Sequence, residues 1–106
     1  MKNEKKKKAY MRNHEKLAPV FKAFSNPKRI NLLLAIREEA CRVGNMTECI
    51  NESFPIVSQQ LAILKRHGIV EREKKQNNEV YYTIINDLAL KILDLIEEFD
   101  KKKIKA

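Results

Sequence analysis

Residues 46–83 combine two helix-forming segments, separated by a turn, with a charged pair of strand-forming segments. The strand segments are residues 69–74 and 79–84, and the Gln76-Asn77-Asn78 stretch between them tolerates the positive φ of a tight turn. A helix-turn-helix followed directly by a two-stranded hairpin predicts a winged helix-turn-helix. We therefore expect a mainly α fold of about five helices with one small β-hairpin, the wing.

The second helix of this unit, expected from about Pro55, carries the most informative surface. Val57, Leu61 and Leu64 recur at helical spacing and predict the side that faces the core. The opposite side is expected to hold Ile56, Ser58, Gln59 and Gln60, with Lys65 and Arg66 near its end. Hydrogen-bonding groups suit base edges and cations suit phosphates, and glutamine can bond adenine N6 and N7 together. Double-stranded DNA is the predicted partner.

The formal net charge of +8 comes from the two ends of the chain. Residues 1–8 and 101–106 each carry a net charge of +4, whereas residues 9–100 hold 13 Lys/Arg and 13 Asp/Glu. We expect a basic disordered arm, one folded domain and a basic tail over these three ranges. Residues 54–82 carry five cations against three anions, and residues 87–100 carry one against five. DNA is therefore expected at the hairpin and not at the last helix.

Two helices are expected before this unit. The first covers about residues 10–24, where Pro19 marks either a kink or the start of the second half of the helix. The Ser25-Asn26-Pro27 stretch is a clear start for the second, because asparagine caps well and proline suits the first helical position. This second helix is expected to reach about Ala40.

The remaining helix boundaries follow from turn residues. A short third helix is expected over residues 46–51, and Ser53 is expected to cap the helix that follows. Gly68 is expected to end that helix in the left-handed conformation. A final helix over residues 87–100 carries one apolar stripe, formed by Leu88, Ile92, Leu95, Ile96 and Phe99.

Over about residues 17–99 the chain resembles the ArsR/SmtB family of bacterial and archaeal winged-helix repressors. The resemblance lies in FKAFSNPKRINLLLAI from Phe21, SFPIVSQQLAILKRHGIV from Ser53, and the pair Tyr81-Tyr82. It implies a homodimer joined through its first and last helices, an inverted-repeat operator, and release by a metal ion, thiol oxidation or another signal. The expected interface residues are Leu17, Phe21, Leu88, Ile92, Leu95, Ile96 and Phe99.

By the same resemblance, Ser58, Gln59 and Gln60 fall where the family reads DNA, with Gln60 in place of a common histidine. The hairpin tip departs from the family, since it lacks the usual glycine and arginine. The expected phosphate contacts are Lys65, Arg66, Arg72, Lys74 and Lys75, with Asn77 and Asn78 at the turn. The alternative is an ordinary charged surface. Tyr81 and Tyr82 point to opposite faces of their strand, one into the core and the other toward the sugar–phosphate chain, and the order is open.

No metal site or cofactor is predicted. The family's third-helix sensor needs a Cys-x-Cys pair, whereas this stretch reads GNMTECI, and the last helix has no histidine. Cys41 and Cys49 form a candidate redox pair if the link between them folds back far enough for a disulfide. The alternative is two small, part-buried residues. Without an export signal, both thiols are expected to be reduced in the cytoplasm.

The leading hypothesis is a dimeric, sequence-specific transcriptional repressor. One alternative is a regulator without any inducer, and another is a winged-helix module that docks a protein, which the neutral body favours. Salt dependence separates the two partner classes, because phosphate binding weakens steeply with salt. An enzyme is not expected, since the chain has no Gly-rich phosphate loop and no clear nucleophile–base pair. The longest apolar run, residues 30–36, is too short to span a bilayer.

Overall fold

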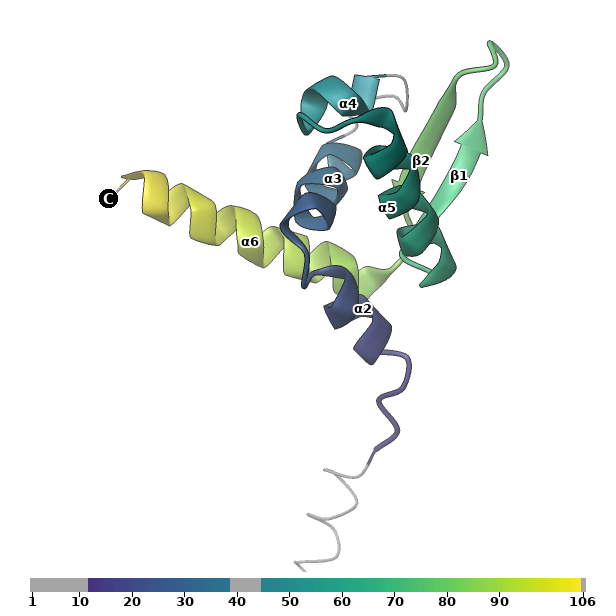
Figure 1. Ribbon diagram of the computed structural model, residues 1–106. Coiled ribbons are helices and arrows are strands. Elements are labelled where there is room, and N and C mark those ends of the chain that lie inside the picture. Colours follow the sequence, from purple (N-terminus) through teal and green to yellow (C-terminus); the bar gives the residue numbers. More distant parts are fainter. Residues whose placement is uncertain (1–11, 39–44, 106) are drawn as a thin grey trace, which may run out of the picture.

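The computed structural model describes residues 12–38 and 45–105, with side chains as far as Lys102 (Figure 1). The expected basic arm, residues 1–8, lies outside these ranges. The described elements are α2 (Ala18–Ala23), α3 (Pro27–Arg37), α4 (Met46–Cys49), α5 (Phe54–Arg66), β1 (Val70–Lys74), β2 (Val80–Ile84) and α6 (Asp87–Lys105). The predicted architecture is confirmed: α4 and α5 form the helix-turn-helix, and β1 and β2 form an antiparallel wing.

Prolines set the starts of the first two helices. α2 begins at Ala18 with Pro19 in its first turn, and residues 12–17 before it are not helical. The prediction of a helix from residue 10 is therefore wrong over residues 12–17, because the imino ring is best tolerated where no backbone donor is needed. The Asn26 cap is confirmed, since its Oδ1 accepts a hydrogen bond from the backbone N–H of Lys28 at 2.8 Å.

Both helices of the helix-turn-helix end with a residue of positive φ. After α4, Asn51 has φ 53°, and the amide of Glu52 donates to the carbonyl of Thr47 at 3.0 Å. After α5, Gly68 has φ 72°, and the amide of Ile69 donates to the carbonyl of Leu64 at 3.0 Å. These backbone bonds satisfy carbonyls that a helix end otherwise leaves open. The predicted role of Gly68 is confirmed.

The start of α5 differs from the prediction in one detail. Ser53 occupies the N-cap position in an extended conformation, but its side chain makes no capping hydrogen bond. The helix begins one residue earlier than expected, at Phe54, with Pro55 in its first turn. Pro55 has no backbone N–H, so one of the donors that a capping side chain would normally accept from is absent.

The wing is a regular hairpin with an asparagine in place of a glycine at its tip. Its register pairs Arg72 with Tyr82 and Lys74 with Val80. At the tip, the amide of Lys75 donates to the carbonyl of Glu79 at 2.9 Å, and Asn78 has φ 64°. Asparagine adopts this left-handed conformation more readily than other side-chain-bearing residues. This result confirms the prediction of an asparagine turn.

The core surrounds α3, which packs against α4, α5, α6 and β2. The largest fully buried side chains include Leu32, Leu33, Met46, Leu64 and Leu93, which come from four different helices. In Figure 1, α5 lies between α3 and the wing, while α6 passes along the opposite side of α3. The core thus fixes α5 against the wing and leaves the outer face of both open.

α6 is longer than predicted and only its first half is packed. It runs to Lys105, beyond the expected end near Asp100, and its far end projects from the body (Figure 1). Its cap is Asn86, whose Oδ1 accepts from the amide of Ala89 at 2.9 Å. Arg37 of α3 holds the helix in place, with ion pairs to Asp94 at 2.5 Å and to Glu97.

Candidate nucleic-acid interface

The exposed face of α5 is the centre of the candidate interface. Val57, Leu61 and Leu64 are buried as predicted, whereas Ser58 and Gln59 are exposed. Ile56 is half-buried at the margin of this face. Pro55 and Ala62 are also exposed on it, and sequence reasoning did not single them out. These small or compact residues leave room for a close approach to a base edge or a backbone.

Gln60 requires a correction. Its residue is only 8% exposed, and its side chain lies on the core side of α5, not beside Ser58 and Gln59. The physical reason is its spacing, because Gln60 follows Val57 by three residues and precedes Leu64 by four. The expectation that Gln60 lies on the exposed face with Ser58 and Gln59 is therefore wrong, and its helical spacing from Val57 and Leu64 already indicated the core side.

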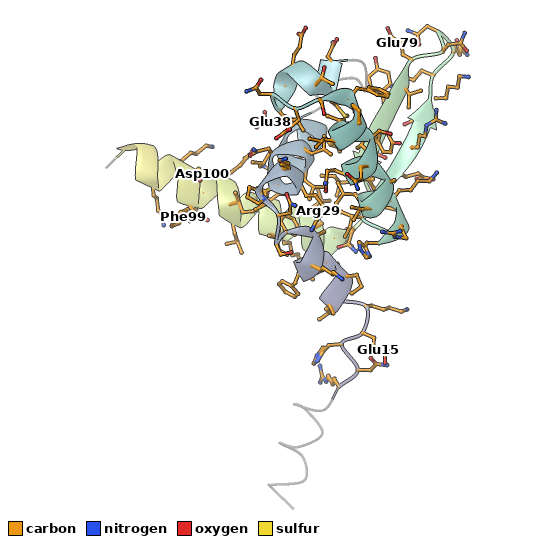
Figure 2. All side chains as sticks on the ribbon, viewed as in Figure 1. Glu15, Arg29, Glu38, Glu79, Phe99 and Asp100 are labelled. Carbon is orange, nitrogen blue, oxygen red and sulfur yellow. The ribbon has the colours of Figure 1, made fainter. Side chains whose placement is uncertain are left out.

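Arg29 explains how a polar amide is tolerated there (Figure 2). Its Nη1 donates to Oε1 of Gln60 at 3.0 Å, its Nε donates to the carbonyl of Ala23 at 2.9 Å, and its Nη2 donates to the carbonyl of Lys22 at 3.0 Å. The guanidinium of Arg29 therefore donates to two backbone carbonyls at the end of α2 and to the buried amide oxygen of Gln60 on α5. Arg29 stands in the Asn-Pro-x-Arg stretch, but nothing in the sequence alone pointed to this partner.

A groove runs between α5 and the wing. It has a volume of about 190 Å³ and is lined by residues that include Phe54, Ser58, Arg72 and Tyr82. We call this cavity the α5–wing groove and identify it by these four lining residues. Phe54 is 62% exposed at the first position of α5, and sequence reasoning missed it. The groove brings together Arg72 of β1 and Ser58 of α5. The sequence predicted each residue as a DNA contact but did not relate one to the other.

The predicted cations fall at two ends of the wing. Arg72, Lys74 and Lys75 are exposed along β1 and its tip, next to the exposed Asn77 and Asn78. The predicted Lys65 and Arg66 are also exposed, but they lie at the base of the wing, because β1 begins four residues after α5 ends (Figure 1). The tip cations and the last turn of α5 therefore form two separate positive areas.

The two tyrosines take different roles. Tyr82 packs against the hydrophobic core, half-buried. Tyr81 faces the other way, where its hydroxyl donates to Oε2 of Glu79 at 2.7 Å and Nζ of Lys75 lies 4.7 Å from the ring centroid. Figure 2 places Glu79 at the wing tip. The order left open by the sequence is thus Tyr82 inward and Tyr81 outward.

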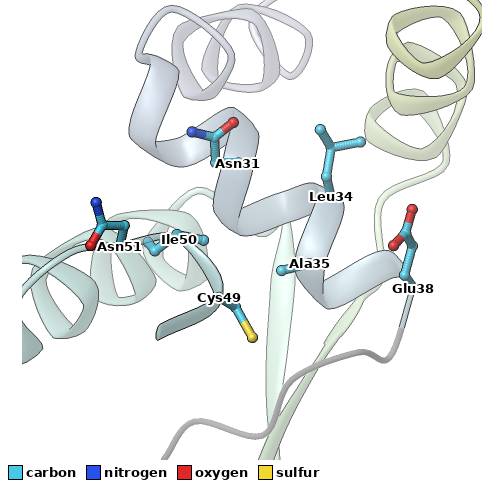
Figure 3. A pocket seen from close by; sticks show the side chains of 7 residues that line it. All are labelled: Asn31, Leu34, Ala35, Glu38, Cys49, Ile50 and Asn51. Atoms are coloured by element: carbon cyan, nitrogen blue, oxygen red, sulfur yellow. The ribbon is translucent and has the colours of Figure 1, made fainter. Parts of the chain in front are cut away.

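Cys49 differs from the expectation of a part-buried, reduced thiol. The residue is exposed at the end of α4 and takes part in a disulfide bond. The sequence holds one other cysteine, Cys41, which lies outside the described residues. Cys49 also borders a cavity of about 490 Å³ between α3 and α4, shared with Leu34 and Glu38 (Figure 3). Met46, at the other end of α4, takes the core position.

An apolar surface lies away from the wing, on α2 and α6. Of the predicted interface residues, Leu88 and Ile92 pack against the core and Ile96 is half-buried. Four stand exposed: Leu17, Phe21, Leu95 and Phe99. Figure 2 shows Phe99 on the far part of α6.

Among the described residues, no group of three or more His, Cys, Asp or Glu side chains is placed to hold a metal ion. Every helix described is too short or too polar to cross a membrane.

Fold and surface together define a winged helix-turn-helix protein. The sequence pattern of the family described as "Bacterial regulatory protein, arsR family" matches residues 26–72. An HTH-type transcriptional regulator of Methanocaldococcus jannaschii is 34% identical over 93 residues, covering 83% of this chain and 99% of that protein. The chain belongs to the ArsR family and is a DNA-binding transcriptional regulator.

Two further proteins are informative. The HTH-type transcriptional repressor SmtB of Mycobacterium tuberculosis is 31% identical over 77 residues, which cover 73% of this chain and 57% of the repressor. The solution structure of a homodimeric winged helix-turn-helix DNA-binding domain from Mycobacterium bovis superposes with a TM-score of 0.67 at 21% identity. The superposition covers 86% of this chain and 83% of that one. At this identity the superposition supports the fold alone.

Proposed function

We propose that this regulator is a sequence-specific repressor that binds an inverted-repeat operator as a homodimer. The observation that carries the proposal is the exposed pair Ser58 and Gln59 on α5, flanked by Arg72 of the wing. A helix with exposed hydrogen-bonding groups enters the major groove, and a cation beside it neutralises phosphate. The relative SmtB is a repressor, which supports repression as the proposed role.

The exposed apolar residues on α2 and α6 support the proposed dimer. Phe21, Leu95 and Phe99 are each more than half exposed. Burying such side chains against a second copy is favourable by roughly 25 cal/mol per Å². The M. bovis neighbour is a homodimer of the same fold, which supports this assembly. Two copies related by a twofold axis would read two half-sites of opposite orientation.

This proposal gives the protein a cytoplasmic location and a binding role, without a catalytic step or a cofactor. The competing role is a protein-docking module with the same fold. Docking through an apolar surface depends little on salt, whereas neutralising phosphates depends on it steeply.

Selection of duplexes from a random DNA pool tests the proposal. We expect enrichment of an inverted repeat whose half-site centres lie about 10–10.5 base pairs apart, or a multiple of that spacing. Enrichment of a single asymmetric site would contradict the dimeric arrangement. A pool without any enriched sequence, after rounds in which the protein retains DNA, would contradict sequence-specific reading.

A second candidate feature is a response to thiol oxidation. It is supported by the disulfide of Cys49, which lies in α4, and α4 packs against α5. We propose that breaking this bond shifts α4 and changes DNA affinity. Titrations of the selected duplex with oxidised and reduced protein should differ by about tenfold or more, and Cys49→Ser should remove the difference. A difference that persists in Cys49→Ser would rule out this cysteine.

A further inference from the structure

Phe54 is a large apolar side chain in a position that the fold leaves open. It is 62% exposed and stands at the first position of α5. Single exposed apolar residues are common on protein surfaces and need no explanation by themselves. What distinguishes Phe54 is its place, because the first turn of a recognition helix is the part that reaches base edges.

Its neighbours are those of a DNA-reading residue. Ser58 follows one helical turn later, so both residues lie on the same side of α5, and both line the α5–wing groove with Arg72. The acidic residue nearest to it in the chain, Glu52, forms an ion pair with Lys28 at 3.4 Å. Phe54 thus shares a groove with the hydroxyl of Ser58 and the guanidinium of Arg72, while the nearby carboxylate of Glu52 is paired with Lys28. This setting favours a polyanion with an apolar spot over an apolar protein partner.

The major groove contains one such spot, the C5-methyl group of thymine, and phenylalanine is among the side chains that contact it. We propose that Phe54 is a specificity-determining residue that contacts a thymine methyl group next to the base pair facing Ser58, while Arg72 contacts the adjoining phosphate. This inference rests on the proposed function, since it assumes that α5 reads DNA.

Replacing thymine by deoxyuridine removes this methyl group and changes no hydrogen-bonding edge, so it tests the contact directly. The probe is a duplex enriched from the random pool, in which each thymine is replaced in turn at symmetric positions of both half-sites. At one position we expect the wild-type affinity to fall about fourfold for each methyl removed, or about sixteenfold for both, from the transfer free energy of one buried carbon group.

The protein variants decide which side chain makes the contact. Phe54→Ala should bind the thymine and deoxyuridine duplexes equally, and Phe54→Leu should retain part of the difference. Ile85→Ala is the matched control, because Ile85 is a 55% exposed apolar residue that follows β2 and bonds Ile69 beyond the far end of α5, not its first turn. It should keep the full dependence on the methyl group. Since Phe54 is exposed, all three variants should unfold at a temperature close to that of the wild type.

Three results would overturn the inference. In the first, Phe54→Ala keeps the wild-type loss at every deoxyuridine position. In the second, no thymine methyl affects wild-type binding, although the enriched duplex is still preferred to a scrambled one, so the proposed function stands and the role of Phe54 does not. In the third, the wild type shows no preference between enriched and scrambled duplexes, and the proposed function fails together with the inference.

Discussion

Adjacent glutamines on α5 have different environments. Gln59 is exposed, whereas Gln60 is buried and accepts a hydrogen bond from Arg29. Two consecutive residues on a helix are rotated by about 100°, so one can face DNA while the next faces the core. The exposed amide of Gln59 is available to contact a DNA base, while the buried amide of Gln60 is linked through Arg29 to the end of α2.

Alanine substitutions should separate these two roles. Gln59→Ala should relax base preference at one position per half-site, with a loss of roughly 1–3 kcal/mol in discrimination. Gln60→Ala should instead lower the free energy of unfolding by about 1–2 kcal/mol, because Nη1 of Arg29 loses its acceptor. Binding to single-position operator variants and urea unfolding measure the two effects. A Gln60→Ala protein of wild-type stability with relaxed preference at one position would contradict this assignment.

Gly68 gives a second prediction at the scale of one residue. A Cβ at this position meets no atom within 4 Å, so the only cost of Gly68→Ala is the backbone conformation with φ 72°. We expect a loss of about 1 kcal/mol in the free energy of unfolding, seen as a lower urea midpoint at unchanged slope. Asn51→Gly, at the other positive φ of the helix-turn-helix, should be neutral or stabilising. A destabilising Asn51→Gly would argue against the conformational explanation.

At the scale of elements, periodicity predicted which helices and strands form but not where each one ends. α5 and the wing were predictable because their buried and turn residues repeat with a fixed period. The start of α2 was open because Pro19 could either kink a longer helix or lie in the first turn of a shorter one. The end of α6 was open because the charged residues there do not mark any particular position as the last of the helix. The α5–wing groove was not predictable, since the position of Arg72 in the same groove as Ser58 depends on how the hairpin packs against α5.

The wing should contribute to affinity through its tip cations. Replacing Lys74 and Lys75 by glutamine should weaken binding to all duplexes and lower the slope of log K against log salt by about two. Lys91→Gln is the control, because this exposed lysine lies on α6, away from the wing. An unchanged slope in the Lys74/Lys75 variant would mean that the tip does not touch phosphate.

At the scale of the whole molecule, the proposed DNA-binding surface and the proposed dimer interface lie on different elements. In Figure 1, α5 and the wing lie together, while the far part of α6, which carries the exposed Leu95 and Phe99, projects away from them. Residues 87–100 of α6 carry one cation against five anions, so DNA would meet the side of the molecule away from this part of α6. Arg29 and Arg37 connect these surfaces through α3, which contacts both α5 and α6.

Charges placed on the apolar face of α6 should separate the subunits. The double variant Leu95→Glu and Phe99→Glu places two carboxylates where the side chains are 64% and 65% exposed. The folded monomer should tolerate them, while a dimer would have to bury them at a cost of several kcal/mol. Sedimentation should show a monomer with at least tenfold weaker operator binding. Lys101→Glu, the control, changes an exposed residue on a different face of α6 and should stay dimeric. A double variant that also stays dimeric would place the interface elsewhere.

The site was predictable in part, for reasons that differ between residues. Ser58 and Gln59 were found because helical spacing separates them from Val57 and Leu61. Phe54 was missed because the helix was expected to begin only at about Pro55, which left Phe54 in the preceding turn. The partner of Arg29 was missed because it lies 31 positions away in the chain, and a single sequence carries no signal for such a contact.

The most direct test of DNA reading is a fluorescence-anisotropy titration at two salt concentrations. It compares the DNA immediately upstream of the gene for this protein with a scrambled duplex of the same length and composition. We predict a preference of about a thousandfold or more for the upstream DNA, with both affinities falling as salt rises. Absence of binding to either duplex at low salt would contradict a DNA-reading role for α5 and would favour a protein partner.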